Sequence, residues 1–127
     1  MPIVRAAALA AVPALLAGCA AVTAADGTRF ELGSAEFRSY VERVFREQNK
    51  TGGDLAFALE DAGRAAPGLV AAEDTLLAAC AGLNEVATSR RDEQGIGLKR
   101  SAQAARRAPD CERATLAAQA ELAKAKD

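Results

Sequence analysis

The sequence contains no histidine and no tryptophan, and aromatic side chains make up only 4% of it. Histidine is the commonest general base and metal ligand, so its absence removes the usual Ser/His and Cys/His catalytic pairs. Two cysteines at the spacing of Cys80 and Cys111 do not make a zinc site, which needs four ligands. Neither Gly52-Gly53 nor Gly95-Ile96-Gly97 matches a phosphate-binding loop. We therefore expect no enzyme, no catalytic or metal-binding residue, no cofactor and no small-molecule substrate.

A large net charge is lacking as well. Sixteen Lys and Arg residues nearly balance seventeen Asp and Glu residues, for a formal net charge of −1. This balance argues against a nucleic-acid partner. The acidic pairs Glu60-Asp61 and Glu73-Asp74 are adjacent in sequence, so their side chains point to different faces of a helix. We interpret them as solvated surface rather than as the paired carboxylates of a glycosidase.

The first residues have the pattern of an export signal. Arg5 is followed by an apolar run over residues 6–15, interrupted only by Pro13, and then by small residues. This order is typical of a secretory signal peptide. The run is too short to span a bilayer, which takes about 20 apolar residues. The alternative, a buried alanine-rich helix, does not account for Cys19 at the position of a cleavage site.

Leu16, Ala17, Gly18 and Cys19 together resemble the lipobox of bacterial lipoproteins in its commonest form. The resemblance implies that Leu16-Ala17-Gly18 is recognised by the lipoprotein signal peptidase, which removes residues 1–18. It also implies that the Cys19 thiol carries a diacylglyceryl group and that the mature chain begins there. It covers about the first twenty residues and says nothing about the domain that follows.

The lipobox resemblance has consequences for location. One acyl chain gives marginal membrane binding, whereas two or three chains on Cys19 anchor a protein firmly. The residue after Cys19 is Ala20. In Gram-negative lipoproteins, aspartate at that position favours retention in the inner membrane. For a Gram-negative source, the resemblance thus implies the periplasmic side of the outer membrane, with the inner membrane as the alternative.

The remaining residues suffice for one small domain with a thin core. Alanine is abundant, and alanine favours helices but buries little apolar area. We expect an all-α fold without a sheet, either a small helical bundle or a long helical hairpin plus one N-terminal helix. Residues 19–33, with a turn at Asp26-Gly27, are interpreted as lipidated cysteine and tether. Residues 34–127 are interpreted as the helical domain.

The first helix has a clear start. Ser34 is a good N-cap and Glu36 suits the first turn. Apolar residues follow at helical spacing and form one core-facing stripe: Phe37, Tyr40, Val41, Val44 and Phe45.

The end of this helix is ambiguous at Gly52-Gly53, because two glycines inside a helix cost roughly 2 kcal/mol relative to alanine. The stripe nevertheless resumes in register at Leu55 and Leu59. We expect one helix to about Asp61. A break with Asp54 capping a new helix is the alternative.

Two further helical stretches are separated by a loop over residues 92–97. The first runs from Pro67 to about Arg90, with an inner stripe of Leu69, Leu76, Cys80, Leu83 and Ala87. The second runs from near Leu98 to about Lys124, with inner positions Ala105, Ala108, Cys111, Thr115, Ala118 and Leu122. Pro109 interrupts it, and Asp110 is a candidate cap for the restart.

Arginines flank this loop in sequence. Arg90-Arg91 and Arg106-Arg107 form a small basic cluster near the expected hairpin tip. We interpret them as solvated helix ends. Contact with acidic lipid or peptidoglycan is the functional alternative.

Cys80 and Cys111 remain as an even pair in an exported chain, where disulfides persist. If the chain folds back at residues 92–97 into two antiparallel helices, residues whose numbers add to the same total lie opposite one another. The register that joins the cysteines also pairs Leu69 with Leu122, which aligns the two inner stripes. We therefore predict a Cys80–Cys111 disulfide, with two buried free thiols as the alternative.

These features favour a lipid-anchored, periplasm-facing structural or protein-interaction module. Its expected partners are the membrane and an envelope protein that the sequence does not identify. Secretin pilotins are similar in size, lipidation and disulfide. The alternative is a small inhibitor or exclusion factor that binds a foreign protein, because exclusion lipoproteins of conjugative elements carry a similar Pro-x-Cys context, here Pro109-Asp110-Cys111.

Overall fold

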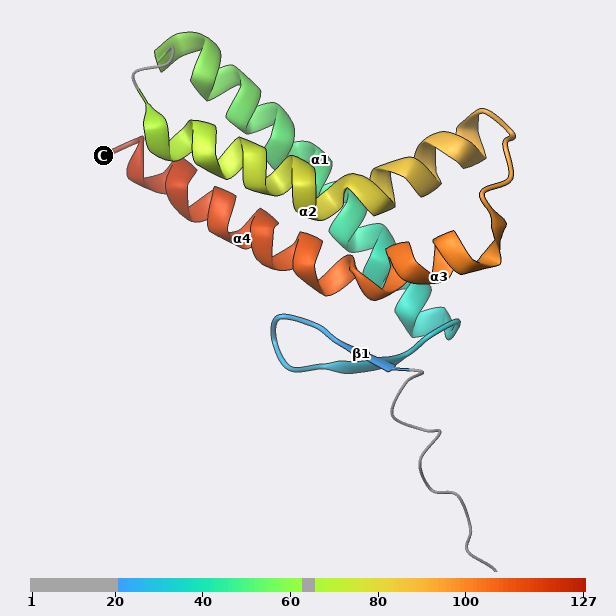
Figure 1. Cartoon of the computed structure of the whole chain (residues 1–127). Coiled ribbons are helices and arrows are strands. Elements are labelled where there is room, and N and C mark those ends of the chain that lie inside the picture. The colour runs from blue at the N-terminus through green and yellow to red at the C-terminus, as the bar shows by residue number, and fades with distance from the viewer. Residues whose placement is uncertain (1–20, 63–65) are drawn as a thin grey trace, which may run out of the picture.

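Four helices and one short β-hairpin make up the part of the chain that the computed structural model describes, residues 21–62 and 66–127. The elements in chain order are β1 (Ala21–Thr23), β2 (Arg29–Glu31), α1 (Ala35–Ala62), α2 (Pro67–Arg91), α3 (Gly97–Arg106) and α4 (Ala108–Lys124). Helices α1, α2 and α4 pack on one another as a three-helix bundle (Figure 1). The expected all-α class is confirmed, apart from the hairpin. None of the described helices is long and apolar enough to cross a bilayer.

Helix α1 is continuous through its two glycines, as expected. Ser34 caps it, because the Ser34 hydroxyl accepts a hydrogen bond from the Phe37 N–H at 3.0 Å. Near the glycines, Thr51 and Leu55 are 2% and 0% exposed. Burial of this face against α2 and α4 therefore offsets the weak helix propensity of Gly52-Gly53.

The inner face of α1 supplies much of the core. Phe37, Tyr40 and Val44 are buried, as the stripe predicted. Two polar residues on the same face are also buried and find partners on the other helices. The Gln48 amide donates to Asn84 of α2 at 2.6 Å, and Thr51 accepts from Gln119 of α4 at 3.1 Å.

The predicted hairpin register between α2 and α4 is confirmed by the disulfide. Cys80 and Cys111 are bonded, with an S–S distance of 2.06 Å and a Cα–Cα distance of 4.7 Å. Both cysteines are fully buried. The opposed residues Leu69 and Leu122 line the same groove at the far end of the helix pair.

The stretch expected from Leu98 onward forms two helices that meet at Arg107. Because α4 begins at Ala108, Pro109 lies in its first turn, where the missing N–H costs no helical hydrogen bond. The expectation that Asp110 caps α4 is wrong, because Asp110 lies inside the helix. Its carboxylate instead pairs with Arg107 at 3.4 Å and Arg113 at 3.1 Å.

The expectations of a tether over residues 19–33 and of no sheet are wrong for residues 21–33. Strands β1 and β2 pair antiparallel, with Val22 opposite Phe30, and the predicted turn at Asp26-Gly27 joins them. Val22 is buried, and the Phe30 ring stacks on Tyr40 with 4.7 Å between centroids. These two apolar side chains give the hairpin a packed face on the bundle, so it belongs to the domain.

Candidate functional site

The proposed lipidation residues Leu16, Ala17, Gly18 and Cys19 lie outside the residues that the structure describes. Strand β1 begins at Ala21, only two positions after Cys19. Of the acidic pairs, Glu60-Asp61 is exposed, whereas Glu73 is half-buried beside an exposed Asp74. The structure brings Cys80 and Cys111 together as a buried disulfide in the core.

A buried carboxylate that the sequence did not single out joins three parts of the fold. Glu112 of α4 accepts hydrogen bonds from the Ala25 backbone N–H at 2.8 Å and from the Tyr40 hydroxyl at 2.8 Å. The Arg43 guanidinium donates to it at 3.1 Å. We call these four residues the Glu112 cluster.

The Glu112 cluster keeps its carboxylate ionised. Burial alone would raise the pKa of Glu112, but hydrogen bonds from Ala25, Tyr40 and Arg43 outweigh it and hold the pKa below its ordinary value. Burial, together with the Glu112 charge, raises the pKa of Tyr40. The cluster is thus an ionised acceptor with three donors, and it holds the hairpin, α1 and α4 in position relative to one another. The part of the chain described contains no group of three metal-ligating side chains.

Only the position of Glu112 beside the predicted inner stripe of α4 pointed to the cluster. Glu112 follows Ala108 by four positions and adjoins Cys111, so it lies at the border of the predicted inner stripe of α4. A carboxylate at that border indicates a buried partner, but the partners come from residues 25–43 and cannot be identified by local spacing.

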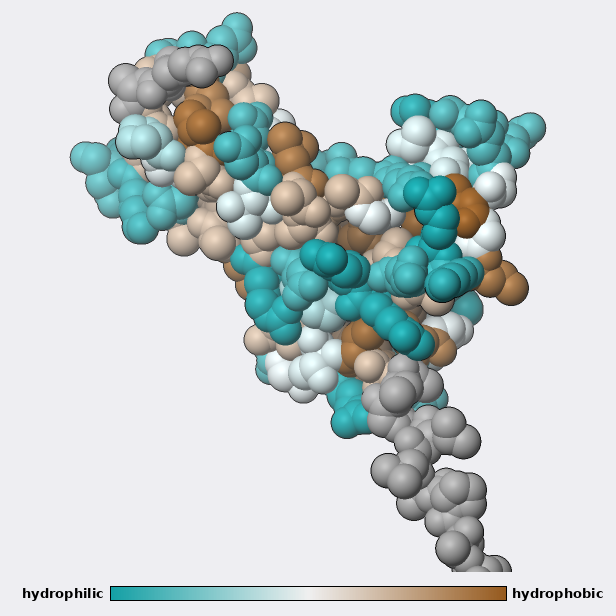
Figure 2. All heavy atoms as spheres, in the orientation of Figure 1, coloured by the Kyte–Doolittle hydropathy of each residue, from teal (hydrophilic) through white to brown (hydrophobic). Residues whose placement is uncertain are grey.

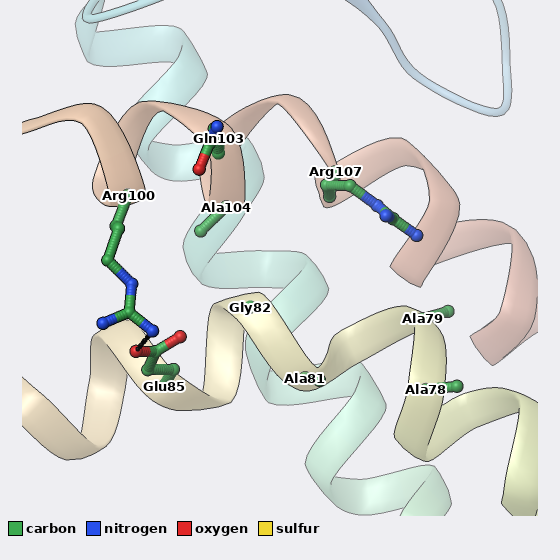
Figure 3. Close-up of a pocket in the computed structure, with 9 residues that line it drawn as sticks. All are labelled: Ala78, Ala79, Ala81, Gly82, Glu85, Arg100, Gln103, Ala104 and Arg107. Carbon is green, nitrogen blue, oxygen red and sulfur yellow. Dashed lines mark ion pairs between the residues drawn. The ribbon is translucent and has the colours of Figure 1, made fainter.

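A shallow groove of about 320 Å³ runs between α2 and α3 (Figure 3). The two helices come close at Gly82, where an added Cβ atom would lie 3.3 Å from that of Ala104. The Arg100–Glu85 ion pair, at 2.6 Å, crosses one end of the groove, and Arg107 lies toward the other. Alanine and glycine form most of its remaining wall, so the groove offers little apolar area to a ligand.

A second groove, of about 560 Å³, lies at the end of the bundle where α1 and α4 finish and α2 begins. We call it the distal groove. Leu69, Leu122 and Ala58 form its apolar wall, and Phe57 stands at its edge with 75% of its surface exposed. Charged residues surround it: Lys50, Asp54, Asp61 and Lys126. An apolar centre inside a polar rim is the usual anatomy of a protein-interaction site.

Hydrophilic side chains gather over α3 and the start of α4 in the view of Figure 2, whereas the α1–α2 end shows hydrophobic patches between hydrophilic ones. Exposed apolar residues also occur away from the distal groove, at Leu77, Leu98 and Leu116.

No protein-family model matches the sequence, and no curated protein and no solved structure shows significant similarity to it.

Proposed function

We propose that the protein is a lipid-anchored, periplasm-facing envelope lipoprotein that acts as a protein-interaction module, with the distal groove as its partner-binding site. The observation that carries the proposal is Phe57, a largely exposed aromatic side chain beside an apolar groove. Large aromatic side chains are enriched at protein interfaces, and Phe57 can be buried by a partner that also fills the groove beside it.

The hairpin supports this proposal because it packs on the bundle and begins two positions after Cys19. Two residues span at most about 7 Å, so Ala21 lies close to the lipid if Cys19 is acylated. The Glu112 cluster holds the hairpin against α1 and α4. The described domain therefore begins at Ala21 with a packed hairpin.

The length of α1 supports the same assignment. Its 28 residues extend about 40 Å, from the hairpin to the distal groove. The chain's C-terminus lies at the groove end, away from β1 (Figure 1). An anchor at the β1 end would therefore leave the distal groove available to a partner in the periplasm.

The anchor is tested by mass spectrometry of the mature N-terminus from the native membrane. We expect an acylated Cys19 as the first residue. Cys19→Ser should accumulate as an unprocessed precursor. A mature protein that retains Met1, or one cleaved elsewhere without lipid, would contradict the anchor.

The groove is tested by site-specific photo-crosslinking in intact cells. A photoreactive phenylalanine at position 57 should trap one discrete envelope protein. The same group at Leu77, 59% exposed on α2 but outside the groove, is the matched control and should not trap it. Leu122→Arg should abolish the product at position 57. Equal products at both positions, or none, would contradict the assignment, and a product with a component of an incoming conjugative system would indicate the exclusion role.

A further inference from the structure

We infer that residues 90–107, the end of α2, the following loop and α3, form a contact surface for anionic phospholipid headgroups of the bilayer that holds the protein. We call this segment the α2–α3 tip. The inference rests on the proposed anchoring at Cys19. It adds a second, non-covalent membrane contact and an orientation.

Charge distribution is the first support. The α2–α3 tip holds six of the chain's basic residues and two of its acidic ones, so its net charge is +4 in a chain of net charge −1. Helix α3 itself has three basic residues and no acidic residue. Segments of this kind are attracted to anionic leaflets, each basic residue contributing about 1 kcal/mol near the surface.

Ion pairing leaves part of this charge available. Arg91 pairs with Asp92, Arg100 with Glu85, and Arg107 with Asp110. Within the described residues no ion pair engages the other three basic residues of the tip, Arg90, Lys99 and Arg106, and all three are exposed.

An apolar side chain accompanies these cations. Leu98, in the first turn of α3, is 91% exposed, which is more than the exposed large hydrophobic residues Phe57, Leu77 and Leu116. It precedes Lys99 and Arg100 directly. A basic helix that also presents a leucine is suited to the bilayer interface, where the cations meet phosphates and the leucine enters the acyl boundary.

Position is the independent support. Ala21 of β1 pairs with Glu31, whose carbonyl accepts hydrogen bonds from Ser34, the cap of α1. The first turns of α1 share a cleft with the tip, lined by Phe37 and Arg38 on one side and by Arg90 and Ser101 on the other. Strand β1 and the tip are therefore at the same end of the bundle, opposite the distal groove, and an anchor two positions before β1 would bring the tip to the membrane side.

The absence of tryptophan from the chain makes a direct test possible, because one introduced tryptophan is the only such fluorophore. Lipidated Leu98→Trp is reconstituted into vesicles that contain brominated acyl chains, which quench tryptophan. One set is phosphatidylcholine alone, and the other is phosphatidylcholine with an equal part of phosphatidylglycerol. Lipidated Phe57→Trp, at the distal groove, is the matched control.

We expect strong quenching of Leu98→Trp in the anionic vesicles, little in the neutral vesicles, and none for Phe57→Trp in either. Adding Lys99→Gln and Arg106→Gln should lower the ratio of bound to unbound tip about fivefold for each charge removed. High salt should release the contact, because the screening length falls to about 3 Å at 1 M.

Several results would overturn the inference. If the fluorescence of Leu98→Trp is not quenched although the protein is acylated, the inferred lipid contact is wrong and the proposed anchor is unaffected. Equal quenching in neutral and anionic vesicles would show that Leu98 inserts without recognition of anionic headgroups. Quenching of Phe57→Trp reverses the orientation. An N-terminal peptide without acyl groups in the same preparation removes both the anchor and this inference.

Discussion

The Glu112 carboxylate and the Ala25 backbone N–H form a 2.8 Å hydrogen bond, although 87 positions separate them in the sequence. The same Oε2 atom accepts a hydrogen bond from the Tyr40 hydroxyl, and Oε1 accepts one from the Arg43 guanidinium. One side chain of α4 thus joins the β-hairpin to α1. If the hairpin follows a lipid anchor, Glu112 determines how the anchored end meets the bundle.

The first prediction concerns this joint. Glu112→Ala leaves the Ala25 N–H and the Tyr40 hydroxyl without their acceptor, and we expect a loss of about 3 kcal/mol in unfolding free energy. Amide hydrogen exchange at Ala25 should accelerate more than exchange in the middle of α2. Glu121→Ala removes the pair between the half-buried Glu121 and the exposed Lys124, within one helix, and should change stability by a few tenths of a kcal/mol. Equal effects of both variants would contradict a special role for Glu112.

The second prediction is a pH dependence. The pKa of Glu112 is lower in the folded chain than its ordinary value of 4.5, so the ionised cluster stabilises the fold above that pH. This stabilisation is lost as the pH falls through the depressed folded pKa. The advantage of wild type over Glu112→Gln, measured by thermal unfolding, should therefore shrink as the pH falls from about 6 to below 4. A difference that stays constant over this range would rule out the ionised carboxylate as its cause.

Helix-forming segments were predictable because their signals are local and repeated. Ser34 predicted the start of α1, and the apolar stripe predicted its buried face. The antiparallel register of the two later helical stretches predicted the Cys80–Cys111 disulfide. Each of these features depends on residues three, four or a few tens of positions apart on regular helices.

The hairpin was not predictable in the same way. Its strands have three residues each, too short for an alternating pattern to be distinguished from a polar linker. What holds them is tertiary: Val22 buried on the bundle, Phe30 stacked on Tyr40, and Ala25 bonded to Glu112. The distal groove likewise depends on the ends of α1 and α4 meeting the start of α2, and residue spacing within one helix does not predict such a meeting.

The third prediction concerns the Cys80–Cys111 bond. It closes a sequence separation of 31 residues, which contributes roughly 3–4 kcal/mol in the chain-entropy picture. Reduction, or Cys80→Ser with Cys111→Ser, should lower the midpoint of thermal unfolding by well over about 5 °C. The double variant should remain helical by circular dichroism. Two titratable thiols in the oxidised native domain would contradict the bond.

The last prediction uses the glycines of α1. Gly53 has no atom within 4 Å of an added Cβ, and at Gly52 the nearest atom is a Leu76 methyl carbon at 3.9 Å, an ordinary contact. Both have helical backbone, so an alanine side chain fits without strain and restricts the unfolded chain. Gly52→Ala and Gly53→Ala should each raise the free energy of unfolding by up to about 1 kcal/mol in urea titrations. Gly97→Ala, at φ +71°, has equal space but a left-handed backbone and should destabilise. A loss of stability in Gly53→Ala would show that α1 needs to bend at that point, because neither packing nor propensity accounts for it.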